Sequence, residues 1–259
     1  MMKRMQIFEF TDLPWWPEVL RSLLTDFLEL LMKVTQPFSP KISLLTEVMK
    51  ETKQTRFVDL CSGSGGPWLS LIKDLQKISG ENISILLTDK YPNSERAKKL
   101  NPISGLNYFP YSVDALAVPS DLKGIRTLFN GFHHFPPDYA FDIINDAVKN
   151  DQPIVVFEIL QRTWFDFFYF MLTPINLLLL TPWVQPRSIT RLILTYLIPI
   201  APIVVSWDSL VSILRCYTPE ELMNMAHQTN AKHYIWKTGK YRHKGLPVTF
   251  LVGYPAKEK

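Results

Sequence analysis

Short apolar segments, most of which end on a polar residue, recur between residues 55 and 158. They lie at residues 55–59, 82–89, 106–112, 126–129 and 153–158. Segments of about four to eight residues rich in Val, Ile, Leu and Phe are typical of buried strands. The stretch from Trp68 to Leu75, between the first two, is typical of a helix. The pattern predicts an α/β fold with a parallel sheet.

A glycine-rich turn follows the first predicted strand. The sequence VDLCSGSGG, residues 58–66, places Asp59 at the strand end and Gly63, Gly65 and Gly66 in the turn. Glycine has no Cβ, so such a turn can adopt a positive φ and let a ligand approach its backbone amides. A sharp turn after a buried strand uses the same residues without a ligand, so the turn alone leaves both interpretations open.

Polar residues at the later strand ends favour a nucleotide. Asp89 lies 24 residues after Gly65 (89 − 65), where an acid can accept hydrogen bonds from ribose hydroxyls. Asp114 follows the third predicted strand, NGFHHFP follows the fourth, and Glu158 ends the fifth. Because the carboxyl ends of parallel strands meet at one edge, we expect these residues to line one crevice.

These residues resemble the motifs of the class I S-adenosylmethionine-dependent methyltransferases. VDLCSGSGG is similar to the first motif of that family, LLTD to its ribose-binding motif, VDA to its adenine-binding motif, and NGFHHF to a segment that borders cofactor and substrate. The chain departs from the family pattern at Cys61, where a glycine is usual. The resemblance implies S-adenosylmethionine as the cofactor, with these residues binding it: Asp59, Cys61, Gly63, Gly65, Asp89, Asp114 and Asn130.

The end of the chain predicts a closing antiparallel hairpin. A helix from Thr218 to Gln228 begins with T-P-E-E, in which Thr218 can cap and the proline occupies the first turn. Two strand-like segments follow, at residues 233–240 and 247–253, separated by a basic stretch. The resemblance implies a Rossmann-like, seven-stranded methyltransferase sheet that ends with this hairpin. A dinucleotide dehydrogenase would end on parallel strands, so methyl transfer is favoured over hydride transfer.

His133, His134 and Glu158 are the candidate catalytic residues. A methyl group on a sulfonium needs an aligned nucleophile and no metal, but a hydroxyl acceptor also needs a base. Imidazole titrates near neutral pH, which suits that role. The alternatives are that the histidines only hold the loop or pack against ligand, and that Glu158 caps the next helix. We expect His133→Ala and His134→Ala to leave cofactor binding nearly intact.

Segments outside the sheet pattern divide the chain further. Residues 18–34 and 40–50 read as amphipathic helices, so residues 1–50 form an N-terminal helical extension, either packed on the sheet or acting as a lid. The predicted methyltransferase domain comprises residues 51–160 and 217–259. Residues 161–216 form an apolar helical insertion.

The insertion holds two apolar runs, residues 167–180 and 192–205, interrupted by prolines at positions 174, 199 and 202. A membrane-spanning helix needs about 20 apolar residues, which argues against two crossings. Arginines and tryptophans near the run ends are typical of a lipid headgroup boundary. The alternatives are a cap over an apolar substrate, a membrane-interface element or a homodimer interface. The residues concerned are Arg162, Arg187, Arg191 and Arg215, with Trp164, Trp183 and Trp207.

Composition adds few constraints. The 259 residues are 47% hydrophobic, enough for one large domain with a decoration. The net charge of +4 is too small to indicate a nucleic-acid partner, and two cysteines are too few for a disulfide framework or a zinc site. The first residues lack a secretory-signal pattern. We expect a cytoplasmic protein, at the inner face of the membrane if the insertion binds lipid.

The sequence predicts an enzyme that methylates a small apolar acceptor such as a quinone, an isoprenoid or a lipid-like phenol. Two alternatives stay open. One is a protein that binds the cofactor without catalysis and docks on a membrane or partner through residues 161–216, which Cys61 in place of glycine favours. The other is an NAD-linked oxidoreductase.

Overall fold

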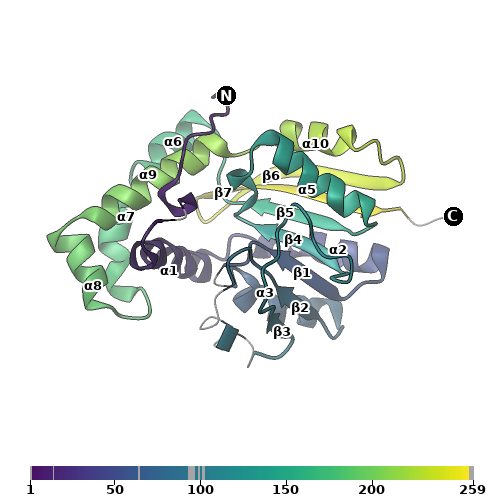
Figure 1. The fold of residues 1–259 in the computed structure, drawn as a ribbon, viewed down its shortest axis with the longest axis horizontal. Coiled ribbons are helices and arrows are strands. Elements are labelled where there is room, and N and C mark those ends of the chain that lie inside the picture. The colour runs from purple at the N-terminus through teal and green to yellow at the C-terminus, as the bar shows by residue number, and fades with distance from the viewer. Residues whose placement is uncertain are drawn as a thin grey trace. The chain divides into compact units, whose positions relative to one another are not determined.

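The computed structural model describes residues 2–13, 15–63, 65–92, 97–98, 100 and 103–256. The chain forms two compact units. The helical unit consists of Met1–Gln36 and Leu160–Tyr217, and the sheet unit consists of Pro37–Ile159 and Thr218–Lys259. Figure 1 shows the elements of both units along the chain.

The sheet unit contains a seven-stranded sheet in the order β3-β2-β1-β4-β5-β7-β6. The strands β1 to β5 are parallel, and β7 is antiparallel to both β5 and β6. This arrangement confirms the predicted α/β fold and its closing hairpin. The strands are β1 (Arg56–Leu60), β2 (Ser84–Leu87), β3 (Leu106–Tyr108), β4 (Ile125–Phe129), β5 (Ile154–Glu158), β6 (Tyr234–His243) and β7 (Leu246–Pro255).

Helices bury the central strands of this sheet. Every residue of β4 and β5 is buried, as expected for strands covered on both faces. Helix α2 packs against α3 and β7, while α10 packs against α5, β6 and β7. The described helices of this unit are α2 (Ile42–Thr52), α3 (Trp68–Ser79), α5 (Pro137–Lys149) and α10 (Pro219–Gln228), with the short 3-10 turns η2 (Ser39–Lys41) and η3 (Phe132–His134).

The start of α10 forms as its sequence predicts. The Thr218 hydroxyl accepts a hydrogen bond from the Glu221 amide at 3.1 Å, and the Glu221 carboxylate accepts one from the Thr218 amide at 2.9 Å. This reciprocal pair satisfies two amide donors that a helix end would otherwise leave unpaired. It fixes where the chain enters the last helix before the hairpin.

The helical unit packs around one apolar core. Leu23, Leu24 and Phe27 of α1 pack with Leu177 and with residues of the later helices. The amphipathic helix α1 therefore buries its apolar face in this core. The elements are α1 (Glu18–Thr35), α6 (Trp164–Phe170), α7 (Thr173–Leu180), α8 (Ile189–Leu192) and α9 (Ile200–Arg215), with 3-10 turns η1 (Phe10–Asp12) and η4 (Thr181–Trp183) and the π-helical turn η5 (Ile193–Leu197).

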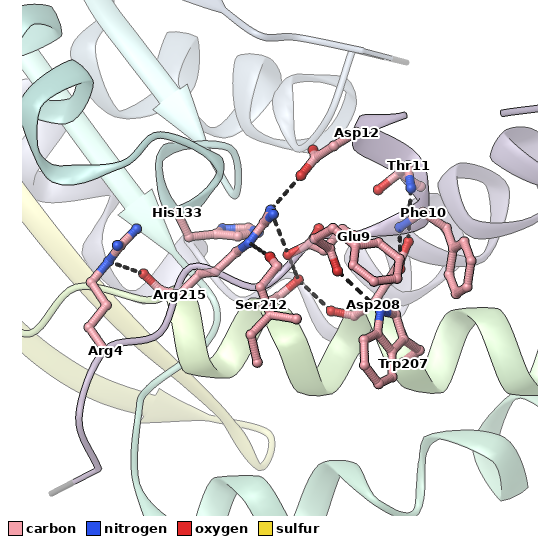
Figure 2. A network of polar contacts seen from close by, with 12 residues as sticks. Arg4, Glu9, Phe10, Thr11, Asp12, His133, Trp207, Asp208, Ser212 and Arg215 are labelled. Atoms are coloured by element: carbon pink, nitrogen blue, oxygen red, sulfur yellow. Dashed lines mark hydrogen bonds and ion pairs between the residues drawn. The ribbon is translucent and has the colours of Figure 1, made fainter. Parts of the chain in front are cut away.

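Buried polar contacts attach the N-terminal segment to α9 (Figure 2). The Asp208 carboxylate accepts a hydrogen bond from the Phe10 amide at 2.8 Å. The Arg215 guanidinium pairs with Asp12 at 2.6 Å and with the buried Glu9 at 3.2 Å. Charges taken out of water need such partners, so these contacts fix the path of the segment along the helix.

Three of the four arginines expected at a headgroup boundary are buried instead. The exposed fractions of Arg162, Arg191 and Arg215 are 4%, 6% and 3%, whereas Arg187 is exposed. Arg191 forms an ion pair with Asp26 of α1, and it donates to the Pro186 carbonyl at 2.5 Å. The expectation that these arginines lie at headgroups is therefore wrong for the three buried ones, because carboxylates or carbonyls of the same unit engage at least two of them.

The compact units differ from the predicted domains at the first boundary. Residues 37–50, predicted as part of the N-terminal extension, belong to the sheet unit. Glu47 of α2 pairs with Lys237 of β6 at 2.6 Å and accepts a hydrogen bond from the Tyr254 hydroxyl at 2.7 Å. These contacts hold α2 against the closing hairpin, which sequence spacing does not reveal.

Candidate active site

Polar residues gather where the parallel strands end. In the sheet, β2 and β3 lie on one side of β1, whereas β4 and β5 lie on the other side. The order of the strands therefore reverses between β1 and β4. Ligands of open α/β sheets bind in the crevice outside the carboxyl strand ends at such a point. The predicted site residues after β1, β2, β4 and β5 all lie at this edge of the sheet.

Hydrogen bonds to β2 shape the turn after β1. The Ser62 amide donates to the Thr88 carbonyl at 3.0 Å, and the Ser62 hydroxyl donates to the Asp59 carbonyl at 2.8 Å. The amide and the hydroxyl of Thr88 also donate to the Asp59 carbonyl, each at 2.8 Å. The turn is thereby held in one conformation before any ligand contacts it.

The Asp59 carboxyl is buried and bonded within the sheet. Its exposed fraction is 2%, and it accepts a hydrogen bond from the Thr127 hydroxyl of β4 at 2.6 Å. Burial raises the pKa of Asp59 to about 6, and the Thr127 hydrogen bond offsets part of that effect. Asp59 thus joins β1 to β4 beneath the turn. Its predicted contact with the cofactor stays a prediction.

The turn itself contains a run of positive φ angles. Gly63, Gly65 and Gly66 have φ values of +50°, +94° and +50°, while Ser64 lies outside the described residues. A Cβ added at Gly63 would have no atom within 4 Å, so the space above this residue is open. Open space over backbone amides is what a ligand cradle requires.

Cys61 adopts a backbone conformation that favours glycine. Its φ is +56°, in the left-handed region that L residues other than Asn and Asp rarely enter. Burial raises the pKa of its thiol, which is therefore neutral at physiological pH. Cys61 therefore carries backbone strain at the start of the turn.

Asp89 lies directly across from the turn. Its Oδ2 accepts a hydrogen bond from the Gly63 amide at 2.9 Å, and its Oδ1 accepts one from the Tyr91 amide at 2.9 Å. Each carboxylate oxygen has a further lone pair, so Asp89 can still accept from a ligand hydroxyl. The structure brings the predicted ribose acid and the glycine turn into contact.

Asp114 is paired with a residue that the sequence analysis missed. Lys90 donates to its Oδ2 at 2.8 Å, and the Leu116 amide donates to its Oδ1 at 3.0 Å. Burial tends to raise the pKa of Asp114, but the hydrogen bond from Lys90 and that from the Leu116 amide outweigh burial and lower it. The position of Lys90 next to Asp89 in the sequence could have identified it as a residue of the site, because it lies beside the same strand ends.

Asn130 holds the ends of β4 and β5 together. The φ of Asn130 is +56°, and its backbone amide donates to the Phe157 carbonyl at 2.7 Å. Its Oδ1 accepts a hydrogen bond from the Ile159 amide at 3.3 Å. Asparagine tolerates the left-handed conformation better than most residues, which explains its place here. The predicted cofactor contact of Asn130 stays a prediction.

The candidate catalytic residues His133 and Glu158 form a buried pair. The Nδ1 of His133 lies 2.5 Å from Oε2 of Glu158, and Oε1 of Glu158 accepts a hydrogen bond from the Phe132 amide at 2.6 Å. Both side chains are 2% exposed. His134 is half-buried, and its ring centroid lies 4.3 Å from that of His133.

Glu158 does not cap the following helix. Helix α6 begins after Thr163, whose hydroxyl accepts a hydrogen bond from the Asp166 amide at 3.0 Å. The alternative interpretation of Glu158 as a helix cap is therefore wrong, because a threonine five residues later (163 − 158) already performs that role. Glu158 instead orients an imidazole.

Such a pair can accept a proton from a substrate. A carboxylate at Nδ1 favours the tautomer in which Nδ1 carries the hydrogen. When Nε2 takes a proton, the same carboxylate stabilises the imidazolium that results. The arrangement is compatible with the predicted general-base role of His133, which stays a prediction.

The residues at this edge fit an adenosyl cofactor. The glycine turn offers open backbone amides, Asp89 offers acceptors for ribose hydroxyls, and Asp114 offers acceptors at the next strand end. The open space over Gly63 adjoins Asp89 through the hydrogen bond between them. These are the chain's own groups that could hold such a molecule.

Comparison with known proteins gives solved structures only. No protein-family model and no curated protein matches the sequence. An O-methyltransferase family protein from Burkholderia thailandensis is similar with a TM-score of 0.45 and 12% identity, covering 86% of this chain and 57% of its own. LepI in complex with SAM gives 0.48 and 15%, covering 79% and 43%. Human N-acetylserotonin methyltransferase in complex with SAM gives 0.49 and 12%, covering 92% and 57%.

This chain thus spans about half the length of these three proteins. At such identities and TM-scores the likeness carries no argument about activity. A function has to be inferred from the residues and the sheet of this chain.

Proposed function

We propose that the protein is an S-adenosylmethionine-dependent methyltransferase that acts on a small apolar acceptor. The observation that carries the proposal is the hydrogen bond between Asp89 and the Gly63 amide at the switch point of the sheet. It joins an acid for ribose to an open glycine turn, the two features that an adenosyl ligand needs. Asp114 is proposed to face the adenine.

The closing hairpin favours this cofactor over NAD. The strand β7 lies antiparallel between β5 and β6, where a dehydrogenase sheet would continue with parallel strands. When bound, the cofactor supplies a methyl group on a positively charged sulfur. The chain then has to orient the acceptor, exclude water and remove a proton where the acceptor is a hydroxyl.

His133 is proposed as the base for that proton. The Glu158 carboxylate orients its ring through Nδ1 and would stabilise the imidazolium that forms when the ring takes a proton. His133 lies in η3, directly after β4, and Glu158 is the last residue of the neighbouring strand β5. The apolar character of the acceptor is inferred from the composition of residues 161–216.

The inactive alternative loses its main support. It rested on Cys61 in place of glycine, but Cys61 has a φ of +56° and the turn keeps its hydrogen bonds to β2. A turn that retains this geometry can bind the cofactor as a glycine turn would. An enzyme therefore fits the residues better than a docking protein without activity.

Calorimetric titration tests the cofactor. S-adenosylmethionine and S-adenosylhomocysteine should bind the purified protein with micromolar affinity, and Asp89→Ala should weaken both at least tenfold. Asp121→Ala changes an exposed acid of the same unit and should have no effect. Binding of NAD alone would overturn the proposal, and absence of binding to any of the three would favour the docking protein.

Substitution of His133 tests the base. With apolar phenols as acceptors, His133→Gln should lower kcat by a factor of about 10² to 10⁴ while the Kd for S-adenosylmethionine stays within about threefold. His227→Gln, on the exposed face of α10, is the matched control and should leave both unchanged. Loss of cofactor binding in His133→Gln would contradict a role on the substrate side, and His134→Gln shows which ring of the pair matters.

A further inference from the structure

The helices of residues 164–203 expose an apolar surface, here called the apolar face. Its most exposed side chains are at least 59% accessible, and they belong to α6, α7, η4, α8, η5 and α9. Water-facing patches of this extent are rare on soluble monomers and mark an interaction surface. The residues are Trp164, Phe165, Phe168, Leu179, Trp183, Ile189, Leu197 and Ile203.

Charge is almost absent from this face. Three charged side chains, Asp166, Arg187 and Arg191, occur between Trp164 and Ile203. Asp166 is fully buried and Arg191 is 6% exposed in its ion pair with Asp26, so Arg187 is the single exposed charge in this stretch. Ionisable groups that turn inward and pair with one another are typical of a surface in contact with lipid.

Polar groups of the face bond within the unit. The Tyr196 hydroxyl donates to the Leu178 carbonyl at 2.5 Å, and the Thr181 hydroxyl donates to the Leu177 carbonyl at 2.7 Å. The join between α6 and α7 keeps its backbone hydrogen bonds, for example from the Ile175 amide to the Leu172 carbonyl at 3.0 Å. A hydrocarbon environment demands this, because it offers no partners.

The dimensions match a bilayer. Trp164–Trp183 forms a 20-residue helical stretch with a mean hydropathy of 1.4, of which only 22% is buried. At about 1.5 Å per residue it extends about 30 Å, close to the hydrocarbon thickness, and tryptophans lie at both ends. The following pair, Ile189–Leu197 and Ile200–Arg215, is bent by 81°. The core helix of a soluble protein would instead be mostly buried.

We propose that the apolar face inserts into a lipid bilayer and that Arg187 contacts the phosphates of anionic lipids. Residues 159 and 218, on either side of the insertion, both belong to the sheet unit. The inserted chain must therefore return to the side that it left. This proposal does not depend on methyl transfer, since lipid binding requires no turnover.

Vesicle flotation tests the proposal on the full chain. The protein should float with phosphatidylcholine vesicles and bind more tightly when phosphatidylglycerol is included. Ile203→Asp, at a position 66% exposed on α9, should weaken binding at least tenfold. Ile78→Asp, at a position 57% exposed on α3, is the matched control and should not. Arg187→Gln should remove the preference for anionic vesicles.

A second measurement needs no variant that could misfold. Lipids brominated on their acyl chains should quench tryptophan fluorescence of the wild type, and Trp164→Phe with Trp183→Phe should lose most of that quenching. Two results would overturn the proposal. One is the absence of flotation and quenching. The other is a dimer that forms without lipid and dissociates in Ile203→Asp, because a second copy would then cover the face.

Discussion

Asp59 shows how one buried carboxyl links the candidate site to pH. Its pKa is raised to about 6 from an unfolded value of 3.8, because burial disfavours the charged form. Below about pH 4 the group is protonated in both states. As the pH rises towards 6, only the unfolded state releases the proton readily, so the free energy of unfolding falls, and above pH 6 it stays at the lower value.

Asp59→Asn should remove this dependence. The difference of about 2 pKa units corresponds to about 3 kcal/mol, so the variant should gain up to that amount on the wild type between pH 4 and pH 7. The amide oxygen can still accept from Thr127, which keeps the local geometry. Urea unfolding at pH 4, 5.5 and 7 measures the effect, and parallel curves for the two proteins would contradict it.

Cys61 carries strain that a substitution can relieve. The left-handed conformation costs an L residue about 1–2 kcal/mol, a cost that glycine would remove. The greater conformational freedom of glycine in the unfolded chain offsets part of this stabilisation. Cys61→Gly should therefore raise the free energy of unfolding by about 0.5–1 kcal/mol. Cys216→Gly, at a φ of −57°, is the matched control and should lower it. Equal effects of the two substitutions would argue against strain at Cys61.

At the residue scale, the sequence shows which residues belong to the candidate site more readily than it shows which residues they contact. The acids at strand ends were visible because each directly follows an apolar segment. The contact of His133 with Glu158 was not, since it depends on how two loops turn after β4 and β5. Arg126 looked like an ordinary strand residue, yet it is buried and pairs with Asp146 of α5 at 2.5 Å.

Among the elements, the closing hairpin packs closely across its two strands. Gly253 of β7 lies opposite Trp236 of β6, and a Cβ there would come 2.0 Å from the indole ring. The indole also stacks on Tyr234, with ring centroids 5.3 Å apart. A glycine is therefore required by its neighbour and not by a turn.

Gly253→Ala should lower the free energy of unfolding by about 1–3 kcal/mol, as overpacking does. In the Trp236→Ala background the same substitution should lower it by less than about 1 kcal/mol, because the clash is gone. Thermal unfolding of the four proteins in this cycle measures the coupling between the two positions. Additive effects would show that the indole is not what excludes the methyl group.

Helices and strands can be predicted from this sequence where the spacing of apolar residues agrees with the turn or cap residues beside it. The strands of the sheet, α1, α3, α10 and the hairpin were each marked by an apolar run and a turn or cap. The insertion is harder to predict, because Pro174 interrupts the apolar run in the sequence. In the structure Pro174 follows Thr173 in the first turn of α7, where a proline is well tolerated. The stretch from Trp164 to Trp183 is in consequence longer than the sequence suggested.

On the scale of the whole molecule, we expect each of the two compact units to unfold separately. If the adenosyl site lies in the sheet unit as proposed, S-adenosylhomocysteine at about 100 times its Kd should stabilise that unit by about 2.7 kcal/mol. Hydrogen exchange should then slow at amides of β1 and β4 and remain unchanged at those of α1. Equal slowing in both units would show that they unfold as one.

The order of the strands also bears on synthesis of the chain at the ribosome. The strand β5 ends at Glu158, but its neighbour β7 begins only at Leu246, so one edge of β5 stays unpaired until those later residues have emerged. The helical unit likewise waits for residues up to 217 before its first 36 residues have their partners. The nascent polypeptide therefore exposes unpaired strand and helix surfaces while the segments in between are made, and protection by chaperones during that interval matters more for it than for a protein built from consecutive segments.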